Sequence, residues 1–293
     1  MTRLCALALC LLSFVLPAGA DVADDVVAQV LANVAKVRAA DPQAVPMAFW
    51  DFDGTIVKGD VSEGLEENGK VLFKGLVQRT IEEGLSPVYA KGSGLALYQK
   101  DYLRMQEIGR WLAWPYNAQI YPGVPVAKLD EFCRREFDAV YRRWYFRFSV
   151  KVLKALEAAG VENYIGSGSP ELFVRNAAES LGIPRSRFRG IRVVENGGRM
   201  TTQIVYPISF GEGKVETVRE LILACPHAVA VAGFGNSYTT DGYFLRYIAT
   251  QPSLPGGAKG TAVMINGGET KKGFSEHFIL LDETEVVGRQ GSL

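Results

Sequence analysis

The segment from Ala48 to Ile56, which reads Ala-Phe-Trp-Asp-Phe-Asp-Gly-Thr-Ile, constrains the fold more than any other part of the chain. Its first three residues form an apolar run that is typical of a short buried strand. Asp51 and Asp53 then stand at the carboxyl end of that strand, where open α/β sheets bind ligands, and alternation puts both side chains on one side. Two adjacent carboxylates repel each other, so the pair indicates a bound divalent cation or unequal proton affinities, although an ordinary Asp-Gly turn is the alternative.

Apolar runs and helical segments alternate along most of the remaining chain. This alternation predicts an α/β fold with a Rossmann-like, mostly parallel sheet and helices on both faces. One hairpin is expected where two apolar arms flank Asn196-Gly197-Gly198. The expected helices cover residues 21–40, 150–159, 171–180, 215–224 and 243–248, and the other expected strands cover 161–165, 228–232 and 262–265.

Residues 58–146 have a different pattern, in which helical stretches are separated by Gly and Pro breaks. We interpret this segment as an all-helical insertion between the first strand and the rest of a core formed by residues 21–57 and 147–293. It is rich in aromatic side chains, most of which we expect to form its own core, with one or two facing a substrate cleft. The expected helices of the insertion cover residues 65–83, 95–114 and 126–146.

The N-terminus has the pattern of a targeting segment. A basic start with Arg3 precedes an apolar run over residues 4–16, and small residues follow up to Ala20. This pattern predicts a signal peptide over residues 1–20, export to the periplasm or the medium, and no stable membrane insertion after cleavage. A transmembrane anchor is the alternative, but the run is short for one.

Composition narrows the possible functions further. A formal net charge of zero gives no electrostatic reason to expect a nucleic acid or a membrane surface as partner. The chain has two His residues, which argues against a His-rich zinc site and against a Ser–His–Asp hydrolase. Removal of the signal peptide leaves Cys133 and Cys225, which either form one disulfide or remain separate thiols. The sequence does not determine the oligomeric state.

Four polar positions fall at expected strand or helix ends in chain order: the Asp51/Asp53 pair, Ser167, Lys214, and Asn236 with Asp241. This ordered set resembles the haloacid-dehalogenase (HAD) superfamily, in its phosphoserine-phosphatase-like branch. Over about residues 45–266, the chain shows the family's Asp-x-Asp-Gly-Thr motif, its apolar strand ending in Ser, its helix-start Lys and its later acidic segment. The insertion corresponds to the family's cap.

The resemblance implies phosphoryl transfer and a role for each position. Asp51 is expected to be the nucleophile that forms an aspartyl-phosphate, and Asp53 the general acid and base. Ser167 and Lys214 are expected to hold the phosphate and to assist catalysis. The substrate site is expected to include Gly54, Asp60, Ser167, Gly168 and Lys214, and a Mg²⁺ ion to be bound by Asp51, Asp53 through its carbonyl, Asp241 and Asn236.

These features predict an exported, Mg²⁺-dependent phosphomonoester hydrolase that acts on a small phosphorylated metabolite. A phosphotransferase or phosphomutase of the same superfamily, and a catalytically silent ligand-binding protein, are the alternatives. The chain departs from the family pattern at three points, one of which is that the spacing from Asn236 to Asp241 is one residue longer than the family pattern implies. Asn236 stands where the family has an acid, and Asp60 stands where phosphoserine phosphatases have the Glu that contacts the substrate's amino group, with Glu63 nearby.

Overall fold

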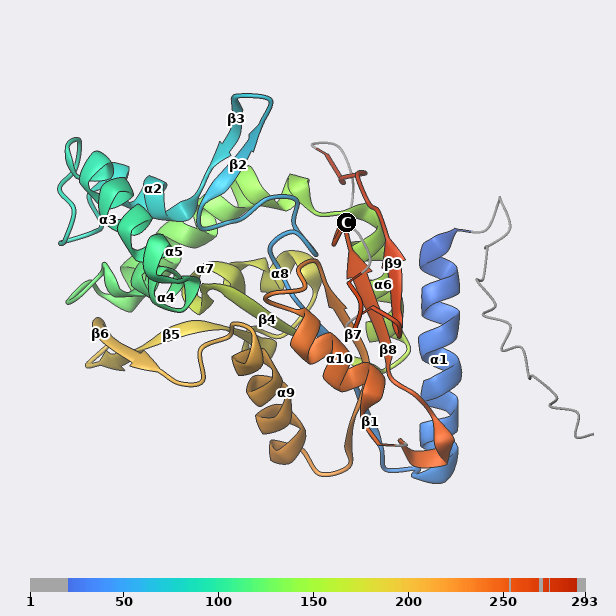
Figure 1. The fold of residues 1–293 in the computed structure, drawn as a ribbon. Coiled ribbons are helices and arrows are strands. Elements are labelled where there is room, and N and C mark those ends of the chain that lie inside the picture. Colours follow the sequence, from blue (N-terminus) through green and yellow to red (C-terminus); the bar gives the residue numbers. More distant parts are fainter. Residues whose placement is uncertain (1–20, 253, 269–270, 274, 289–293) are drawn as a thin grey trace, which may run out of the picture.

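The computed structural model describes residues 21–252, 254–268, 271–273 and 275–288; the predicted signal peptide lies outside this range. Its centre is a seven-stranded sheet with the order β6-β5-β4-β1-β7-β8-β9 (Figure 1). All neighbouring strands are parallel except β5 and β6, which form the expected antiparallel hairpin. The strands are β1 (Val45–Trp50), β4 (Glu162–Pro170), β5 (Phe188–Asn196), β6 (Arg199–Val205), β7 (Ala228–Gly235), β8 (Thr261–Ile265) and β9 (Phe278–Leu281).

Helices cover both faces of this sheet, as the alternation of the sequence predicts. Helices α1 (Val22–Ala40) and α6 (Arg147–Ala158) lie on one face, and α9 (Glu212–Ala224) and α10 (Gly242–Thr250) lie on the other (Figure 1). The side chains of β1 alternate between the two layers. Trp50 joins the core beneath α1 and α6, whereas Phe49 joins the core beneath α9 and α10. The predicted fold class is therefore confirmed.

The segment between β1 and β4 is not all helical, and the prediction of a helix over residues 65–83 is wrong for its first part. Strands β2 (Gly64–Glu67) and β3 (Lys70–Lys74) form an antiparallel hairpin there. The turn residues Asn68 and Gly69 have φ angles of 52° and 73°. Asn-Gly is the commonest pair for a two-residue hairpin turn, because both positions need positive φ. Helix α2 begins only after this hairpin, at Leu76.

Other predicted elements are divided or shifted. The expected helix over residues 95–114 is two helices that meet at Gly109, and the one over 126–146 is α-helical only up to Glu136. Residues 171–180 form two short helices, α7 (Glu171–Val174) and α8 (Ala178–Leu181), and strand β9 was not expected. The helices of the insertion are α2 (Leu76–Glu83), α3 (Gly94–Ile108), α4 (Arg110–Gln119) and α5 (Val126–Glu136).

The structure settles the state of the two cysteines, whereas the alternative of a transmembrane anchor falls on residues 1–20, outside the described range. Cys133 and Cys225 are separate free thiols, and Cys133 is buried. None of the helices in the described ranges is both long and apolar enough to cross a membrane.

The indole of Trp50 ties the central strand β1 to both of its neighbours. Its ring stacks on Phe234 of β7, with centroids 3.7 Å apart and planes 8° from parallel. Its Nε1–H donates to Oδ1 of Asn163 on β4 at 2.8 Å, and all three residues are fully buried. The stack and the hydrogen bond thus hold the strand that ends in Asp51 between its neighbours.

We expect the Trp50→Phe variant to lower the free energy of unfolding by about 2–3 kcal/mol. The change leaves the buried Oδ1 of Asn163 without a donor and opens a small void. Urea denaturation followed by circular dichroism measures this. Trp111→Phe is the matched control, because Trp111 is 58% exposed, and it should change stability by less than about 0.5 kcal/mol. Equal effects of the two variants would contradict this account of the sheet.

Candidate active site

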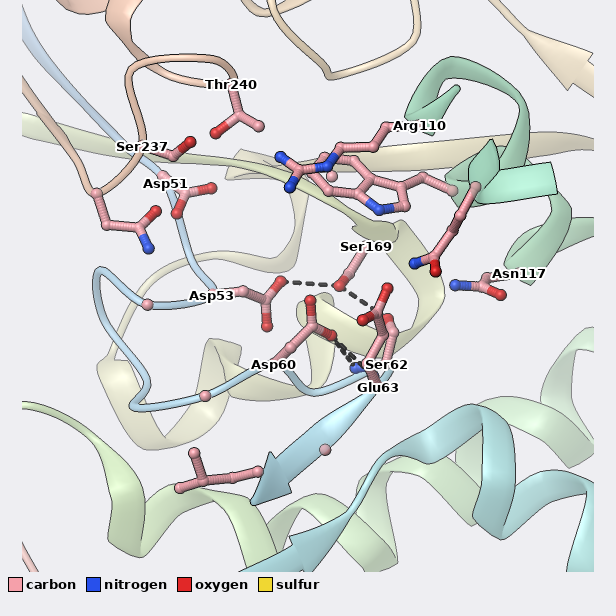
Figure 2. A pocket seen from close by; sticks show the side chains of 18 of the residues that line it. Asp51, Asp53, Asp60, Ser62, Glu63, Arg110, Asn117, Ser169, Ser237 and Thr240 are labelled. Carbon is pink, nitrogen blue, oxygen red and sulfur yellow. Dashed lines mark hydrogen bonds between the residues drawn. The ribbon is translucent and has the colours of Figure 1, made fainter. Parts of the chain in front are cut away.

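A cavity of about 610 Å³ lies at the carboxyl end of β1, between the insertion and the core (Figure 2). The core contributes Asp51, Asp53 and Lys214, and the insertion contributes Arg110 and Trp114. Trp114 bears out the expectation that an aromatic of the insertion faces a cleft. The other lining residues are Gly54, Gly59, Asp60, Ser62, Glu63, Gly64, Leu65, Glu66, Gln106, Asn117, Gly168, Ser169, Asn236, Ser237 and Thr240.

Both oxygens of the Asp51 carboxylate are held by side chains. The ammonium of Lys214, in the first turn of α9, lies 2.5 Å from Oδ1, and the hydroxyl of Thr55 donates to Oδ2 at 2.9 Å. Lys214 also contacts Oδ1 of Asp241 at 2.6 Å. All three charged groups are buried, so one ammonium group faces two carboxylates away from bulk water.

Burial and this charge imbalance shift the proton affinities. Burial, followed by the negative charge of Asp241, raises the pKa of Asp51 to about 7, although Lys214 acts in the opposite direction. Burial alone would lower the pKa of Lys214, but the carboxylates of Asp241 and Asp51 outweigh it and raise that pKa. Lys214 therefore stays charged. Its single positive charge does not fully balance the negative charges of Asp51 and Asp241.

Asp53 lies in a different environment, surrounded by neutral donors. The hydroxyls of Ser167 and Ser169 donate to its Oδ2 at 2.9 and 2.8 Å, and the backbone N–H of Val61 donates to Oδ1 at 2.8 Å. Ser62 in turn donates to Ser169 at 2.7 Å, a chain of bonds that Figure 2 shows as dashed lines. Burial raises the pKa of Asp53, and these hydrogen bonds offset the rise only in part.

Asp241 lies on the far side of Lys214 from the cavity and does not line the cavity. Its Oδ2 accepts the backbone N–H groups of Asn236 and Ser237, both at 3.0 Å, so the loop after β7 wraps around this carboxylate. The side-chain amide of Asn236 lies directly against Gly54, at the place where a Cβ on that glycine would stand. The later acidic segment thus contacts both the lysine and the turn after β1.

The predicted positions converge, but two of them, Ser167 and Asp241, do not line the cavity. Asp51, Asp53, Gly54, Asp60, Gly168, Lys214 and Asn236 all line the cavity. Ser167 is fully buried and directs its hydroxyl to Asp53 instead of lining the cavity, so its role as a phosphate ligand stays a prediction. Gly168 packs directly under the ring of Trp114, where no Cβ would fit.

Asp60 faces the cavity, but one of its oxygens is already bonded. Its Oδ1 accepts the backbone N–H groups of Ser62 and Glu63 at 2.7 and 2.9 Å. Burial, together with the charges of Asp53 and Glu63, raises the pKa of Asp60 well above its usual value. Glu63 accepts a hydrogen bond from the hydroxyl of Tyr102 on α3.

Several cavity residues carry little or no signal in the sequence. Ser169 stands two positions after Ser167 on the same strand, so alternation could have placed both hydroxyls on one side. Ser62 and Arg110 lie in no recognisable motif. Arg110 extends from α4 over the cavity, and its Nη1 donates to the hydroxyl of Thr239 at 3.4 Å (Figure 2).

Residues 48–245 match the HAD family, described as haloacid dehalogenase-like hydrolase. A comparison with curated proteins gives no significant match. The chain is also similar in fold to several solved structures.

One is a protein with unknown function from Bordetella pertussis Tohama I, with a TM-score of 0.56 and 16% identity over 82% of this chain and 99% of that one. Another is cytosolic 5'-nucleotidase IIIB bound to cytidine, with a TM-score of 0.51 and 14% identity over 81% of this chain and 78% of that one. A third is a phosphoserine phosphatase in apo form, with a TM-score of 0.47 and 11% identity over 83% of this chain and 96% of that one. The family match spans more than half of the residues of this chain. The chain therefore belongs to the HAD family of haloacid dehalogenase-like hydrolases.

Proposed function

We propose that this protein is an exported, Mg²⁺-dependent phosphomonoesterase that acts on a small phosphorylated metabolite through an aspartyl-phosphate. The observation that carries the proposal is the pair of carboxylates in one cavity. Asp51 is held by Lys214 and Thr55, as a positioned nucleophile requires, and Asp53 has a raised pKa, as a proton donor requires. Export is supported by the leader-like pattern of residues 1–20.

In the first step, a carboxylate oxygen of Asp51 attacks the phosphorus of the substrate. A bond forms between that oxygen and phosphorus, and the bond from phosphorus to the leaving oxygen breaks. Asp53 gives its proton to the leaving oxygen, which departs as a neutral alcohol. Lys214 stays beside the reacting oxygen and stabilises the negative charge of the phosphoryl group.

In the second step, Asp53 takes a proton from a water molecule that attacks the same phosphorus. The new oxygen–phosphorus bond forms while the bond to Asp51 breaks, so the Asp51 carboxylate and the protonated Asp53 are restored. The hydroxyls of Ser167 and Ser169 keep Asp53 oriented through both transfers. One acid therefore serves in both halves of the reaction.

The donor groups of the cavity fit a magnesium ion. In the described part of the chain, no three His, Cys, Asp or Glu side chains converge to form a complete metal site. Mg²⁺ commonly binds one or two carboxylates and completes its shell with water, carbonyl oxygens and substrate phosphate. Asp51, the carbonyl of Asp53 and the side chain of Asn236 would hold it from within the cavity. The buried carboxylate of Asp241, which lies behind Lys214, would add negative charge close to the ion, and the ion would supply positive charge that Lys214 alone does not provide.

The Asp51→Asn variant should release phosphate roughly 10⁴-fold more slowly than the wild type or worse, because the nucleophile is lost. A screen of sugar, nucleotide, amino-acid and lipid-headgroup monoesters with Mg²⁺ measures the release. Asp138→Asn, at an exposed acid of the insertion, is the control and should keep wild-type activity. Activity that survives in Asp51→Asn would refute the aspartyl-phosphate, and a wild type that only binds esters would favour the silent binding protein.

The Asp53→Asn variant should separate substrates by their leaving groups. A nitrophenolate departs without protonation, so we expect a burst of about one nitrophenol per enzyme from p-nitrophenyl phosphate, followed by slow turnover. An alkyl phosphate needs the proton and should give no burst and at least about a 10²-fold loss of rate. Rapid-mixing kinetics measures both. Equal losses for the two substrates would mean that Asp53 is not the acid.

Chelation should abolish activity, and Mg²⁺ should restore it in the wild type. The Asp241→Asn variant should need at least about tenfold more Mg²⁺ for half-maximal activity, because it removes a buried negative charge beside Lys214 and Asp51 that attracts the cation. Titrations of rate against Mg²⁺ measure this shift. Full activity in chelator would exclude the metal. Capture of the phosphoryl group by added alcohols in place of water would instead indicate a phosphotransferase.

A further inference from the structure

The outward side of helix α3 carries a stripe of two basic residues between two apolar ones. Leu97, Lys100, Arg104 and Ile108 follow one another at steps of three or four residues, which places them on one face of a helix. The opposite face carries Tyr98 and Tyr102, which are buried against the rest of the insertion. Figure 1 shows α3 at the outer edge of the molecule, far from the sheet.

Exposed apolar side chains are concentrated in this region. Of the eleven large hydrophobic residues that are exposed in the described part of the chain, five fall within residues 88–111. Single exposed hydrophobic residues are normal on a protein surface, whereas a cluster of them marks an interaction site. The five are Val88 (45% exposed), Leu97 (53%), Leu103 (59%), Ile108 (65%) and Trp111 (58%).

The charge of this region has one dominant sign. Lys100 and Arg104 are exposed between the apolar residues of α3, and Arg110 follows at the start of α4. Glu107 is the one exposed acid of α3, all of whose residues the structure describes, while Asp101 accepts the hydroxyl of Tyr89. We define the α3 face as Leu97, Lys100, Leu103, Arg104, Glu107 and Ile108 of α3 together with Trp111 of α4.

We propose that the α3 face docks the protein onto the surface of an anionic phospholipid bilayer. A helix that lies in the membrane interface combines large apolar residues with Lys and Arg, which contact the acyl boundary and the anionic headgroups respectively. Trp residues such as Trp111 favour the level of the headgroups. The docking is peripheral, since none of the described helices is suited to cross the bilayer.

The charges of the α3 face argue against a second copy of this chain as the occupant. A two-fold interface pairs a surface patch with itself. Such pairing would bring Lys100 and Arg104 of one protomer close to the same residues of the other, with Glu107 as the single exposed acid of α3 to offset them. An anionic surface opposes these cations without that repulsion.

The α3 face adjoins the cavity described above. Gln106 of α3 and Arg110 of α4 line that cavity, while Leu103 and Trp111, one helical turn or less away in sequence, belong to the α3 face. Docking would therefore hold the insertion, which forms one side of the cavity, at the layer of headgroups. The docking itself does not rest on the proposed function, because it involves none of the residues assigned to catalysis.

Sedimentation with vesicles tests the proposal, using the chain from Asp21 onward, the part whose fold the structure describes. The wild type should bind vesicles of phosphatidylglycerol and phosphatidylcholine and lose this binding in pure phosphatidylcholine and at high salt. The Lys100→Glu/Arg104→Glu variant should bind at least about 30-fold more weakly, because each basic residue near an anionic surface contributes roughly fivefold. The Leu97→Gln/Ile108→Gln variant should lose about tenfold or more.

Matched variants elsewhere on the surface provide the controls. Lys36→Glu/Lys128→Glu changes the same number of charges on α1 and α5, and Leu223→Gln/Val71→Thr removes two exposed apolar residues outside α3. Both should bind like the wild type. Equal binding of all variants, or binding that ignores lipid charge and salt, would overturn the proposal.

Sedimentation velocity without lipid provides a second measurement. The wild type and the α3 variants should sediment alike under these conditions. A dimer of the wild type that the α3 variants abolish would overturn the proposal in favour of a second copy. Should a variant fail to fold, the dependence of wild-type binding on salt and lipid charge still decides the question.

Discussion

The ammonium group of Lys214 is the interaction on which the site depends. It joins the end of β1, the start of α9 and the loop after β7, because it contacts Asp51 and Asp241 at once. Removing one member of such a buried set leaves an uncompensated charge, which typically costs about 3–5 kcal/mol. The same contact leaves the two carboxylates short of positive charge, and a divalent cation is the simplest group to supply it.

The two acids that follow β1, Asp51 and Asp53, are two residues apart, yet their surroundings differ. Asp51 is held by a charged lysine and a hydroxyl, whereas Asp53 is held by hydroxyls and one backbone N–H. Environments of this kind separate carboxylates into a nucleophile and a proton carrier. The link from Ser62 through Ser169 to Asp53 also connects the first residues of the insertion to the acid, so the position of the insertion bears directly on proton transfer.

The distribution of charge on the surface differs from its sum. The chain as a whole has a formal net charge of zero, which by itself gives no reason to expect a membrane surface as partner. The fold nevertheless places Lys100 and Arg104 outward on one helix, between Leu97 and Ile108, at the rim of the insertion. A net charge cannot describe such a local arrangement, since opposite charges on distant faces cancel in the sum.

The sequence by itself determined the parallel α/β sheet and the places of Asp51, Asp53 and Lys214, because these follow from local periodicity and from where strands and helices end. It also contained the Asn68-Gly69 turn, whose hairpin signal was missed in favour of a longer helical pattern. Only the tertiary structure decided that Ser167 turns to Asp53 and that Asp241 stands behind Lys214. The physical reason is distance along the chain, since Ser167 and Asp53 are 114 residues apart. A local sequence pattern shows where a strand or helix ends, but it does not show which distant side chain a polar group will contact once the chain has folded.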